Sequence, residues 1–365
     1  MARPRHRVSD SHGPERISAL TGSWQEPDHL VTVVIPARNE ERFIGPCLES
    51  ILAQNEPRLQ VIVVDGDSED ATAELVAEFA RRDPRVELLH NPQRIIPKSL
   101  NLALGAARGR FLVRVDAHAT VPPGYVRTAV EHLSSGRWGG VGGRKQAVGI
   151  TPAGDAIAAA MASPFGVGNS TYHYGASVQT VEHIPFGAYP TELASRMGGW
   201  DERLVVNQDF EFDYRLRKAG YRLLFDPRLE IAWHCRQSIP DFFSQYRRYG
   251  RGKALVARLH PRSLRARHLA APALIASWIS GAILLPLVPG LAFGILAAYP
   301  LALAGATLAT ARMVRGRARW WIAPAFFAMH AGWGLGFWQG VLRPPVKGLK
   351  REPGRGPERS SEVSV

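Results

Sequence analysis

Three groups of polar residues each come directly after an apolar, β-branched run of the chain. They are Pro36–Glu40, Asp65–Asp67 and Asp116–His118. Acidic side chains are poor phosphate partners by themselves. They suit a site where a divalent cation lies between carboxylates and a diphosphate, or where a carboxylate accepts hydrogen bonds from a base or ribose. A single Asp in such a place is usually a turn residue, but several in register indicate a binding site.

The segments around these groups alternate between strand-like and helix-like patterns. We expect strands at 31–35, 59–64, 85–90 and 111–115, and helices at 40–54, 68–82 and 98–107. Ser68 is expected to cap the second of these helices. Alternation of this kind with continuous apolar strands predicts an α/β fold, in which a mostly parallel sheet has helices on both faces. Ligands of such sheets bind at the carboxyl ends of the strands, where the polar groups lie.

Several common site types are excluded or unsupported. The chain has no G-x-G-x-x-G after its first strand and no G-x-x-x-x-G-K-[ST], so it is neither a dinucleotide-binding nor a P-loop protein. Cys47 and Cys235 form no C-x-x-C pair, and we expect both to be packed thiols. Residues 1–29 are polar and lack the apolar core of a signal peptide, so a mobile N-terminal tail is expected.

The formal net charge of +13 is distributed unevenly along the chain. Residues 1–235 carry 26 basic and 28 acidic side chains, whereas residues 236–267 carry nine basic side chains and one acidic. A nucleic-acid-binding protein would need its positive charge on the folded body. The slightly acidic body therefore argues against nucleic acid as a partner.

The C-terminal third reads as a membrane region. Residues 269–311 contain no charged side chain and no histidine, and residues 320–342 form a second uncharged stretch. A spanning helix needs about 20 apolar residues, so we predict spans near 270–288 and 291–311, with a turn at Pro286, Pro289 and Gly290. The second stretch predicts a third membrane segment, which spans, re-enters or lies along the interface. Basic interfacial helices are expected at 241–268 and a disordered basic tail at 343–365.

Arginines flank the first two predicted spans on both sides. Arg258, Arg262, Arg265 and Arg267 precede them, and Arg312, Arg315, Arg317 and Arg319 follow them. The positive-inside bias places both flanks in the cytoplasm. We thus predict a multi-pass protein of the inner or plasma membrane whose large N-terminal part, residues 30–240, is cytoplasmic.

The motifs together resemble those of family 2 glycosyltransferases with the GT-A fold. The matching segments run in the family's order over about residues 30–250: Val31–Glu40, Val63–Ser68, Lys98–Asn101, Asp116–His118, Pro185–Ala188, Gly198–Asp201, Gln208–Glu211, Arg215–Arg217 and Gln245–Tyr249. The Asp-Ala-His variant and the run after Gln245 further resemble exopolysaccharide glycosyltransferases of the succinoglycan-biosynthesis type. The resemblance implies a GT-A, Rossmann-like catalytic domain followed by transmembrane helices.

The resemblance also implies a donor site. Residues that would line the pocket for the base and ribose of a nucleotide-sugar, with a UDP-sugar favoured, are Pro36, Ala37, Arg38, Glu40, Asp65 and Asp67. Lys98 would face the diphosphate, although it also fits a solvated lysine in the first turn of a helix. Asp116 would bind Mg²⁺ or Mn²⁺. His118 stands where the family usually has a second Asp, and imidazole suits Mn²⁺ better than Mg²⁺.

On the acceptor side, Asp209 matches the aspartate that acts as general base in inverting members of the family. It would remove the proton of the acceptor hydroxyl while that oxygen attacks the anomeric carbon. The alternative is that Asp209, Glu211 and Asp213 are only the polar start of a helix. Gln245, Arg248 and Tyr249 match positions that contact the diphosphate and acceptor, and the same run also fits a juxtamembrane helix that attracts anionic lipid.

Three functions remain open from the sequence. The preferred one is a membrane-anchored, metal-dependent inverting glycosyltransferase that extends a lipid-linked saccharide for a cell-surface or extracellular polysaccharide. The second is a polyprenyl-phosphate or glycolipid sugar synthase, which uses the same chemistry on another acceptor. The third is a non-catalytic nucleotide-binding membrane protein, against which the presence of both Asp116 and Asp209 argues.

Overall fold

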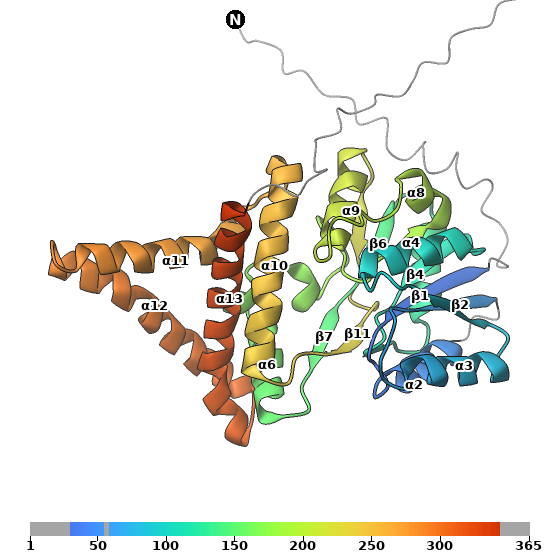
Figure 1. The fold of residues 1–365 in the computed structure, drawn as a ribbon, viewed down its shortest axis with the longest axis horizontal. Helices are drawn as coiled ribbons and strands as arrows, with labels where there is room; N and C mark the ends of the chain where they lie inside the picture. Colours follow the sequence, from blue (N-terminus) through green and yellow to red (C-terminus); the bar gives the residue numbers. More distant parts are fainter. Residues whose placement is uncertain (1–29, 55–57, 344–365) are drawn as a thin grey trace, which may run out of the picture.

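The computed structural model describes residues 30–54 and 58–343. The tails expected at 1–29 and 344–365 lie outside the described residues. A sheet-and-helix body forms one half of the molecule and a set of long helices forms the other (Figure 1). The strands are β1 (Val31–Ala37), β2 (Leu59–Asp65), β3 (Val86–His90), β4 (Phe111–Arg114), β5 (Ala119–Thr120), β6 (Gly140–Gly142), β7 (Lys145–Val148), β8 (Gln179–Val181), β9 (Ala188–Pro190), β10 (Leu223–Phe225) and β11 (Ile231–His234).

The helices of the body and the long C-terminal helices follow the strands in the order of the chain. They are α2 (Ile44–Leu52), α3 (Thr72–Arg82), α4 (Ile96–Ala106), α5 (Tyr125–Ser134), α6 (Pro152–Met161), α7 (Pro164–Val167), α8 (Thr191–Arg196), α9 (Gln208–Lys218), α10 (Ile239–Leu259), α11 (Ala266–Leu284), α12 (Pro289–Thr310) and α13 (Ile322–Leu342).

The main sheet has the strand order β3-β2-β1-β4-β9-β6-β10-β8. The four strands β3, β2, β1 and β4 are mutually parallel, but β9 is antiparallel to both of its neighbours and β8 is antiparallel to β10. Strands β6 and β10 are parallel to each other and, beyond β9, run in the same direction as β1 and β4. The expectation of a mostly parallel sheet is therefore confirmed for the direction of most strands, but the sheet is mixed because β8 and β9 are reversed. A second, three-stranded sheet has the order β5-β11-β7.

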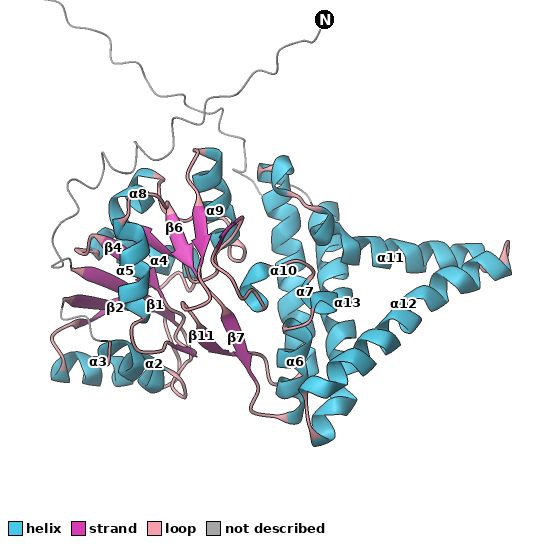
Figure 2. Ribbon diagram, turned by 180° about the vertical axis from the view of Figure 1, so that it is seen from behind, coloured by secondary structure: helices cyan, strands magenta, loops and turns pink. Residues whose placement is uncertain are grey.

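Both faces of the main sheet are covered, as expected. Because successive strand residues point to opposite faces, Val33 belongs to the core that packs against Leu48 of α2, whereas Val34 belongs to the core containing Leu100 of α4 and Phe212 of α9. In Figure 2 the helices lie on either side of the magenta strands. The sheet thus serves as a rigid platform whose strand ends carry the candidate site.

Two helix starts differ from the sequence-based expectation. The helix expected from Glu40 begins at Ile44, because residues 40–43 form a turn in which the Phe43 N–H donates a hydrogen bond to the Glu40 carbonyl. The helix expected from Ser68 begins at Thr72; Ala71, the residue before it, cannot cap it, and Asp70 Oδ1 accepts the Thr72 N–H at 3.0 Å. Ser68 is not a helix cap: its hydroxyl donates to Asp65 and accepts the Asn39 N–H.

The α11–α12 hairpin projects away from the body (Figures 1 and 2). Ala266–Leu284 and Pro289–Met313 are long and apolar enough to cross a membrane. Their apolar side chains are unusually exposed, with Leu301 at 71% and Leu308 at 74% in α12, and Leu287 in the turn between the helices is 72% exposed. The predicted turn is found: α11 ends before Pro286, and Pro289 begins α12, a position where a missing N–H is tolerated.

The third apolar stretch forms α13, which does not stand free. It runs parallel to α10, and Gly332, Gly336 and Gly340 present one face to that helix (Figure 1). A Cβ atom at Gly336 would lie 2.0 Å from the Arg247 carbonyl oxygen, so only glycine permits this approach. Small residues at four-residue spacing allow two helix backbones to approach closely. Helix α13 therefore braces α10 against the body.

Candidate functional site

The ends of β1 and β2 lie next to each other at one edge of the sheet. Ala37 is opposite Asp65, and the Gly66 N–H donates to the Ala37 carbonyl at 2.8 Å. Asp65 is buried and accepts hydrogen bonds from the N–H and hydroxyl of Ser68. The fold therefore brings two of the residues predicted for the nucleotide pocket into one corner.

The loops after β1 and β2 are joined by reciprocal hydrogen bonds. The Asn39 N–H donates to the Ser68 hydroxyl at 3.0 Å, the Glu40 N–H donates to the Thr72 hydroxyl at 2.7 Å, and the Glu69 N–H donates to Asn39 Oδ1 at 2.8 Å. Asn39 has a positive φ of 56° that this turn requires. The two loops therefore form one unit and hold the strand-end residues in a defined arrangement.

The remaining predicted donor residues lie around this corner, with polar partners of their own. Arg38 Nη2 lies 4.0 Å from Glu69 Oε1, and Pro36 is the residue before Ala37 in β1. Asp67 is half-exposed, has a φ of 58° and pairs with Arg94. Lys98 Nζ lies 3.5 Å from Glu202 Oε1. Lys98 thus already has a carboxylate partner on the loop after β9 and α8.

Asp116 is held by a buried arginine that the sequence reasoning missed. Arg114, the last residue of β4, places Nε 3.0 Å and Nη2 2.9 Å from Asp116 Oδ1. The side chain of Arg114 is only 5% exposed, and its Nη1 has no hydrogen-bond partner within the described part of the chain. A buried donor without an acceptor is rare in folded proteins. It is suited to an oxygen atom of a bound substrate.

His118 forms the second part of this arrangement. Its Nδ1 lies 2.8 Å from Glu40 Oε1, so Nε2 is the ring nitrogen left for other contacts. The neighbouring strand brings His234 opposite, where the His234 N–H donates to the His118 carbonyl at 3.1 Å. His234 Nδ1 is buried and unpartnered among the residues described. A histidine whose other nitrogen bonds a carboxylate is the usual form of a histidine metal ligand.

These side chains fit a divalent cation only in part. Between residues 30 and 343, with 55–57 left aside, no cluster of three or more His, Cys, Asp or Glu side chains is arranged to hold an ion by itself. Asp116 and His118 belong to the same turn, and the orphaned nitrogen of His234 is on the adjoining strand. They would suit an ion whose other ligands come from a diphosphate.

Asp209 lies in the first turn of α9. Asn207, the residue directly before the helix, has a φ of 61°, and its side-chain amide donates to the Tyr249 carbonyl of α10 at 2.9 Å. Burial raises the pKa of Asp209, but the nearby positive charges of His183, Arg114 and Lys145 outweigh it and hold the pKa below its ordinary value. The carboxylate is therefore ionised at neutral pH and able to accept a proton.

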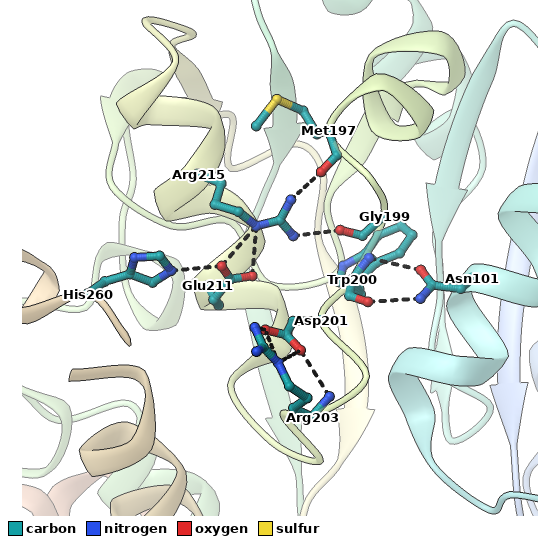
Figure 3. A network of polar contacts seen from close by, with 9 residues as sticks. All are labelled: Asn101, Met197, Gly199, Trp200, Asp201, Arg203, Glu211, Arg215 and His260. Atoms are coloured by element: carbon teal, nitrogen blue, oxygen red, sulfur yellow. Dashed lines mark hydrogen bonds and ion pairs between the residues drawn. The ribbon is translucent and has the colours of Figure 1, made fainter. Parts of the chain in front are cut away.

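A polar network anchors α9 to the rest of the body (Figure 3). Arg215 Nε lies 2.8 Å from Glu211 Oε1, and its Nη2 donates to the Gly199 carbonyl at 2.5 Å. The side chain of Asn101 on α4 exchanges two hydrogen bonds with the backbone of Trp200, both 2.8 Å long. Several motif residues of the sequence analysis thus have a structural role, since they position the helix that carries Asp209.

His183 is a second residue that the sequence reasoning missed. Its Nδ1 lies 2.7 Å from Asp213 Oδ2, and Asp213 also accepts the Ile184 N–H at 2.8 Å and the Tyr189 hydroxyl at 2.9 Å. Asp213 follows Asp209 by one helical turn, so both carboxylates lie on the same side of α9. The sequence signal was weak, because a lone histidine in the loop after β8 has many explanations.

Lys145 is a third missed residue. It begins β7, and its ammonium lies 3.6 Å from the centre of the Trp233 ring and 5.0 Å from that of Phe186. Burial lowers the pKa of Lys145 to about 8, although the negative charges of Asp116 and Asp209 oppose the change. The ammonium thus lies in the field of both candidate catalytic carboxylates.

The three residues predicted for the diphosphate and acceptor lie on α10. Gln245 is buried, Arg248 is exposed, and Tyr249 lies between the helix and the body. Burial raises the pKa of Tyr249 to about 12, with a further increase from the nearby charge of Asp209. Helix α10 therefore reaches the neighbourhood of the candidate base.

Comparison with known proteins agrees with this geometry. The sequence matches the domain described as Glycosyl transferase family 2 over residues 32–178, and that described as Glycosyl transferase family group 2 over residues 111–338. It is 33% identical over 313 residues to the succinoglycan biosynthesis protein ExoA of Rhizobium meliloti, covering 85% of this chain and 94% of that one. The chain belongs to glycosyltransferase family 2. This glycosyltransferase thus has a relative of similar length in exopolysaccharide biosynthesis.

Two further relatives of the glycosyltransferase are more distant. The dolichyl N-acetyl-alpha-D-glucosaminyl phosphate 3-beta-D-2,3-diacetamido-2,3-dideoxy-beta-D-glucuronosyltransferase of Methanococcus voltae is 24% identical over 240 residues, which cover 63% of this chain and 74% of that one. The mannosyltransferase PcManGT of Pyrobaculum calidifontis, solved in complex with GDP-Man and Mn²⁺, superposes with a TM-score of 0.57 at 23% identity. It covers 90% of this chain and 93% of that one, and at this identity the likeness supports the GT-A-like fold alone.

The sequence-based assignment to the family is therefore confirmed, as is the expectation that both cysteines are buried and unpaired. Burial raises the pKa of Cys235 to about 11, which makes it unreactive at neutral pH.

Proposed function

We propose that this glycosyltransferase is a membrane-anchored, metal-dependent, inverting enzyme that moves a sugar from a nucleotide-sugar to a lipid-linked acceptor in the biosynthesis of an extracellular polysaccharide. One observation carries the proposal: the Asp209 carboxylate, kept ionised by Arg114, Lys145 and His183, shares its surroundings with Asp116. A base for the acceptor and a carboxylate for the donor thus occupy one site.

On the donor side, we propose that the joined loops after β1 and β2 bind the nucleoside. Pro36, Ala37, Arg38, Glu40, Asp65 and Asp67 are the residues assigned to this pocket. We expect UDP as the nucleotide, and competition between UDP and GDP for the donor site tests that choice. Lys98 would contact the diphosphate only by leaving Glu202, its partner at 3.5 Å.

For the metal, we propose Asp116 and His118 as ligands, joined by His234 through its orphaned Nδ1. A bound Mg²⁺ or Mn²⁺ would neutralise negative charge on the departing diphosphate. The chain itself adds to this stabilisation through the unpartnered Nη1 of Arg114 and the ammonium of Lys145. Because one ligand is an imidazole, Mn²⁺ is the better-suited ion.

In the reaction, the acceptor oxygen forms a bond to the anomeric carbon as the bond from that carbon to the diphosphate oxygen breaks. The electron pair leaves with the nucleoside diphosphate, and the hydroxyl proton passes to Asp209. A single displacement of this kind inverts the configuration at the anomeric carbon. Gln245, Arg248 and Tyr249 on α10 would hold the acceptor or the diphosphate beside the base.

The acceptor is proposed to be lipid-linked because of the hairpin. Helices α11 and α12 expose apolar side chains along their length, and they leave the body at the end of α10 (Figure 1). A membrane containing the hairpin would therefore lie next to α10. The positive-inside bias then places the catalytic domain on the cytoplasmic side.

The proposal is tested by giving membranes that contain the protein a panel of labelled nucleotide-sugars, with and without EDTA, and extracting the lipids. We expect one donor to label a lipid product, EDTA to abolish labelling, and Mn²⁺ to restore it. The proposal fails if none of the donors is consumed. Failure of Mn²⁺ to restore labelling would refute the metal dependence and leave the other parts of the proposed function standing. A product in which the sugar is bonded directly to phosphate would favour the polyprenyl-phosphate synthase instead.

A further inference from the structure

A cavity of about 400 Å³ opens along α10, and four arginines line it. Its lining residues are Arg236, Asp241, Ser244, Arg247, Arg248, Arg251 and Gln339. Residues 241, 244, 248 and 251 follow the three- and four-residue spacing of one helix face. We call this cavity the arginine pocket. Its volume is in the range of small-molecule sites.

The arginines of the pocket outnumber its acidic residues by four to one, and no carboxylate is paired with them in the described part of the chain. Within residues 30–54 and 58–343, Arg236, Arg247, Arg248 and Arg251 form no ion pair, whereas Arg114, Arg215, Arg228 and many other arginines do. The one acidic residue of the lining, Asp241, accepts a hydrogen bond from Ser238 at 2.6 Å. Four like charges around one cavity repel each other, so an anion would stabilise the pocket.

The pocket is held in place by the helix that braces α10. Gly336 of α13 lies against the Arg247 carbonyl, and Gly340 lies against that of Arg251. Gln339, between these two glycines, adds its amide to the lining. The backbone beneath the arginines is therefore rigid. A specific binding site needs such rigidity, whereas a diffuse basic surface does not.

Two lining residues of the pocket lie near a residue of α10 that also senses the candidate base. Tyr249 follows Arg248 directly, and it is in the electrostatic field of Arg236, Arg248 and Asp209. The side chain of Asn207, two residues before Asp209, bonds the Tyr249 carbonyl. Tyr249 and Asn207 thus connect the helix that carries the pocket to the start of the helix that carries Asp209.

We propose that the arginine pocket binds the phosphate or diphosphate group of the lipid that carries the acceptor sugar. This inference rests on the proposed function in taking the acceptor to be lipid-linked. Guanidinium groups bind phosphate oxygens in pairs of parallel hydrogen bonds, which explains arginine rather than lysine at all four positions. The lipid tail would extend toward the hairpin and the sugar toward Asp209.

The test uses the full chain in detergent with four probes: farnesyl diphosphate, farnesol, inorganic pyrophosphate, and vesicles of phosphatidylcholine with phosphatidylglycerol. The double variant Arg247→Gln/Arg251→Gln removes two charges of the pocket. Arg315→Gln/Arg317→Gln, in the basic segment after α12, is the matched control. We expect farnesyl diphosphate to bind the wild type and the control equally, and the pocket variant at least 10-fold more weakly.

Farnesol should bind weakly to all three proteins, and pyrophosphate should compete with farnesyl diphosphate. Equal affinity of the pocket variant and wild type for farnesyl diphosphate would overturn the inference. An equal loss of affinity for farnesyl diphosphate in the control variant would also overturn it. So would displacement of farnesyl diphosphate by phosphatidylglycerol vesicles that is as effective as displacement by pyrophosphate. Either result would mean a diffuse attraction to anionic lipid. If the double variant does not fold, the single variant Arg251→Gln is measured in the same way, with a several-fold loss expected.

The outcomes separate this inference from the proposed function. Binding of farnesyl diphosphate that depends on the pocket, together with no transfer from any nucleotide-sugar, would refute the proposed function and leave the pocket. Transfer to lipid with no effect of the pocket variant on the KM for that lipid would refute the pocket and leave the function.

Discussion

Arginines of the catalytic body and arginines of α10 are used in different ways. In the body, Arg114, Arg215 and Arg228 each have a carboxylate partner within 3 Å, and two of these three pairs include a nearly buried carboxylate. On α10, Arg247 and Arg251 have no such partner among the described residues and face a cavity instead. The comparison suggests that paired arginines build the site, whereas unpaired ones are available for a substrate.

The largest effect should come from breaking the buried pair at the centre of the site. Arg114→Gln removes the partner of Asp116 and leaves a carboxylate that is only 16% exposed. Loss of one member of such a pair typically lowers the free energy of unfolding by about 3 kcal/mol or more. Denaturation in detergent measures this, with transfer activity expected to be lost as well. A change below about 1 kcal/mol would show that the pair is not structural.

A smaller effect is expected at the network that anchors α9. Arg215→Gln removes its ion pair with Glu211 and its hydrogen bonds to the Met197 and Gly199 carbonyls. Hydrogen bonds of charged groups contribute about 1.5–3 kcal/mol each, and partial replacement by Gln should leave a loss of about 2 kcal/mol. Thermal denaturation measures the loss. Unchanged stability with full activity would contradict the role assigned to the network in Figure 3.

His183 should control the pH dependence of the base. Its positive charge lowers the pKa of Asp209, so His183→Gln should raise that pKa and move the acidic limb of the kcat profile to higher pH. Activity at acidic pH then falls relative to activity at alkaline pH. His132→Gln is the matched control, because His132 makes an equally short contact, 2.7 Å, with Asp226 in another part of the body. If the acidic limb of the kcat profile stays in place in the His183→Gln variant, His183 does not control the pKa of Asp209.

The smallest effect is expected for a paired arginine on the surface. Arg196→Gln breaks an exposed pair with Glu192, whose two side chains are 57% and 54% exposed. Surface ion pairs contribute about 0–1 kcal/mol. Stability and activity should therefore match the wild type within error. A marked loss of activity would show that pairing alone does not separate structural from functional arginines.

Much of the fold could be predicted from the sequence, because the signals are local. The apolar runs at 31–35 and 59–64 and the polar residues that follow them predicted β1 and β2 within two residues at each end. The uncharged stretch at 269–311 predicted the α11–α12 hairpin. The antiparallel β9 was not predictable, since its three residues carry no periodicity and its pairing with β4 depends on contacts distant in the chain.

Recognition of the site was incomplete for a similar reason. Asp116 and Asp209 were found through motifs, but Arg114, Lys145 and His183 were not. Each of these three lies in a strand or loop where a single charged residue has many explanations. Only tertiary structure places them beside the carboxylates. The packing of α13 on α10 was also not predictable, although its glycines at four-residue spacing offered a signal.

The most direct test of the account is the rate of sugar transfer by Asp209→Asn, measured with donor binding in the same preparation. We expect kcat to fall by about 10²- to 10⁴-fold, the usual contribution of a general base. The affinity for the nucleotide-sugar should stay within a few-fold of the wild type, because Asn keeps the shape of the side chain. Transfer at the wild-type rate by a variant that binds its donor normally would contradict the account.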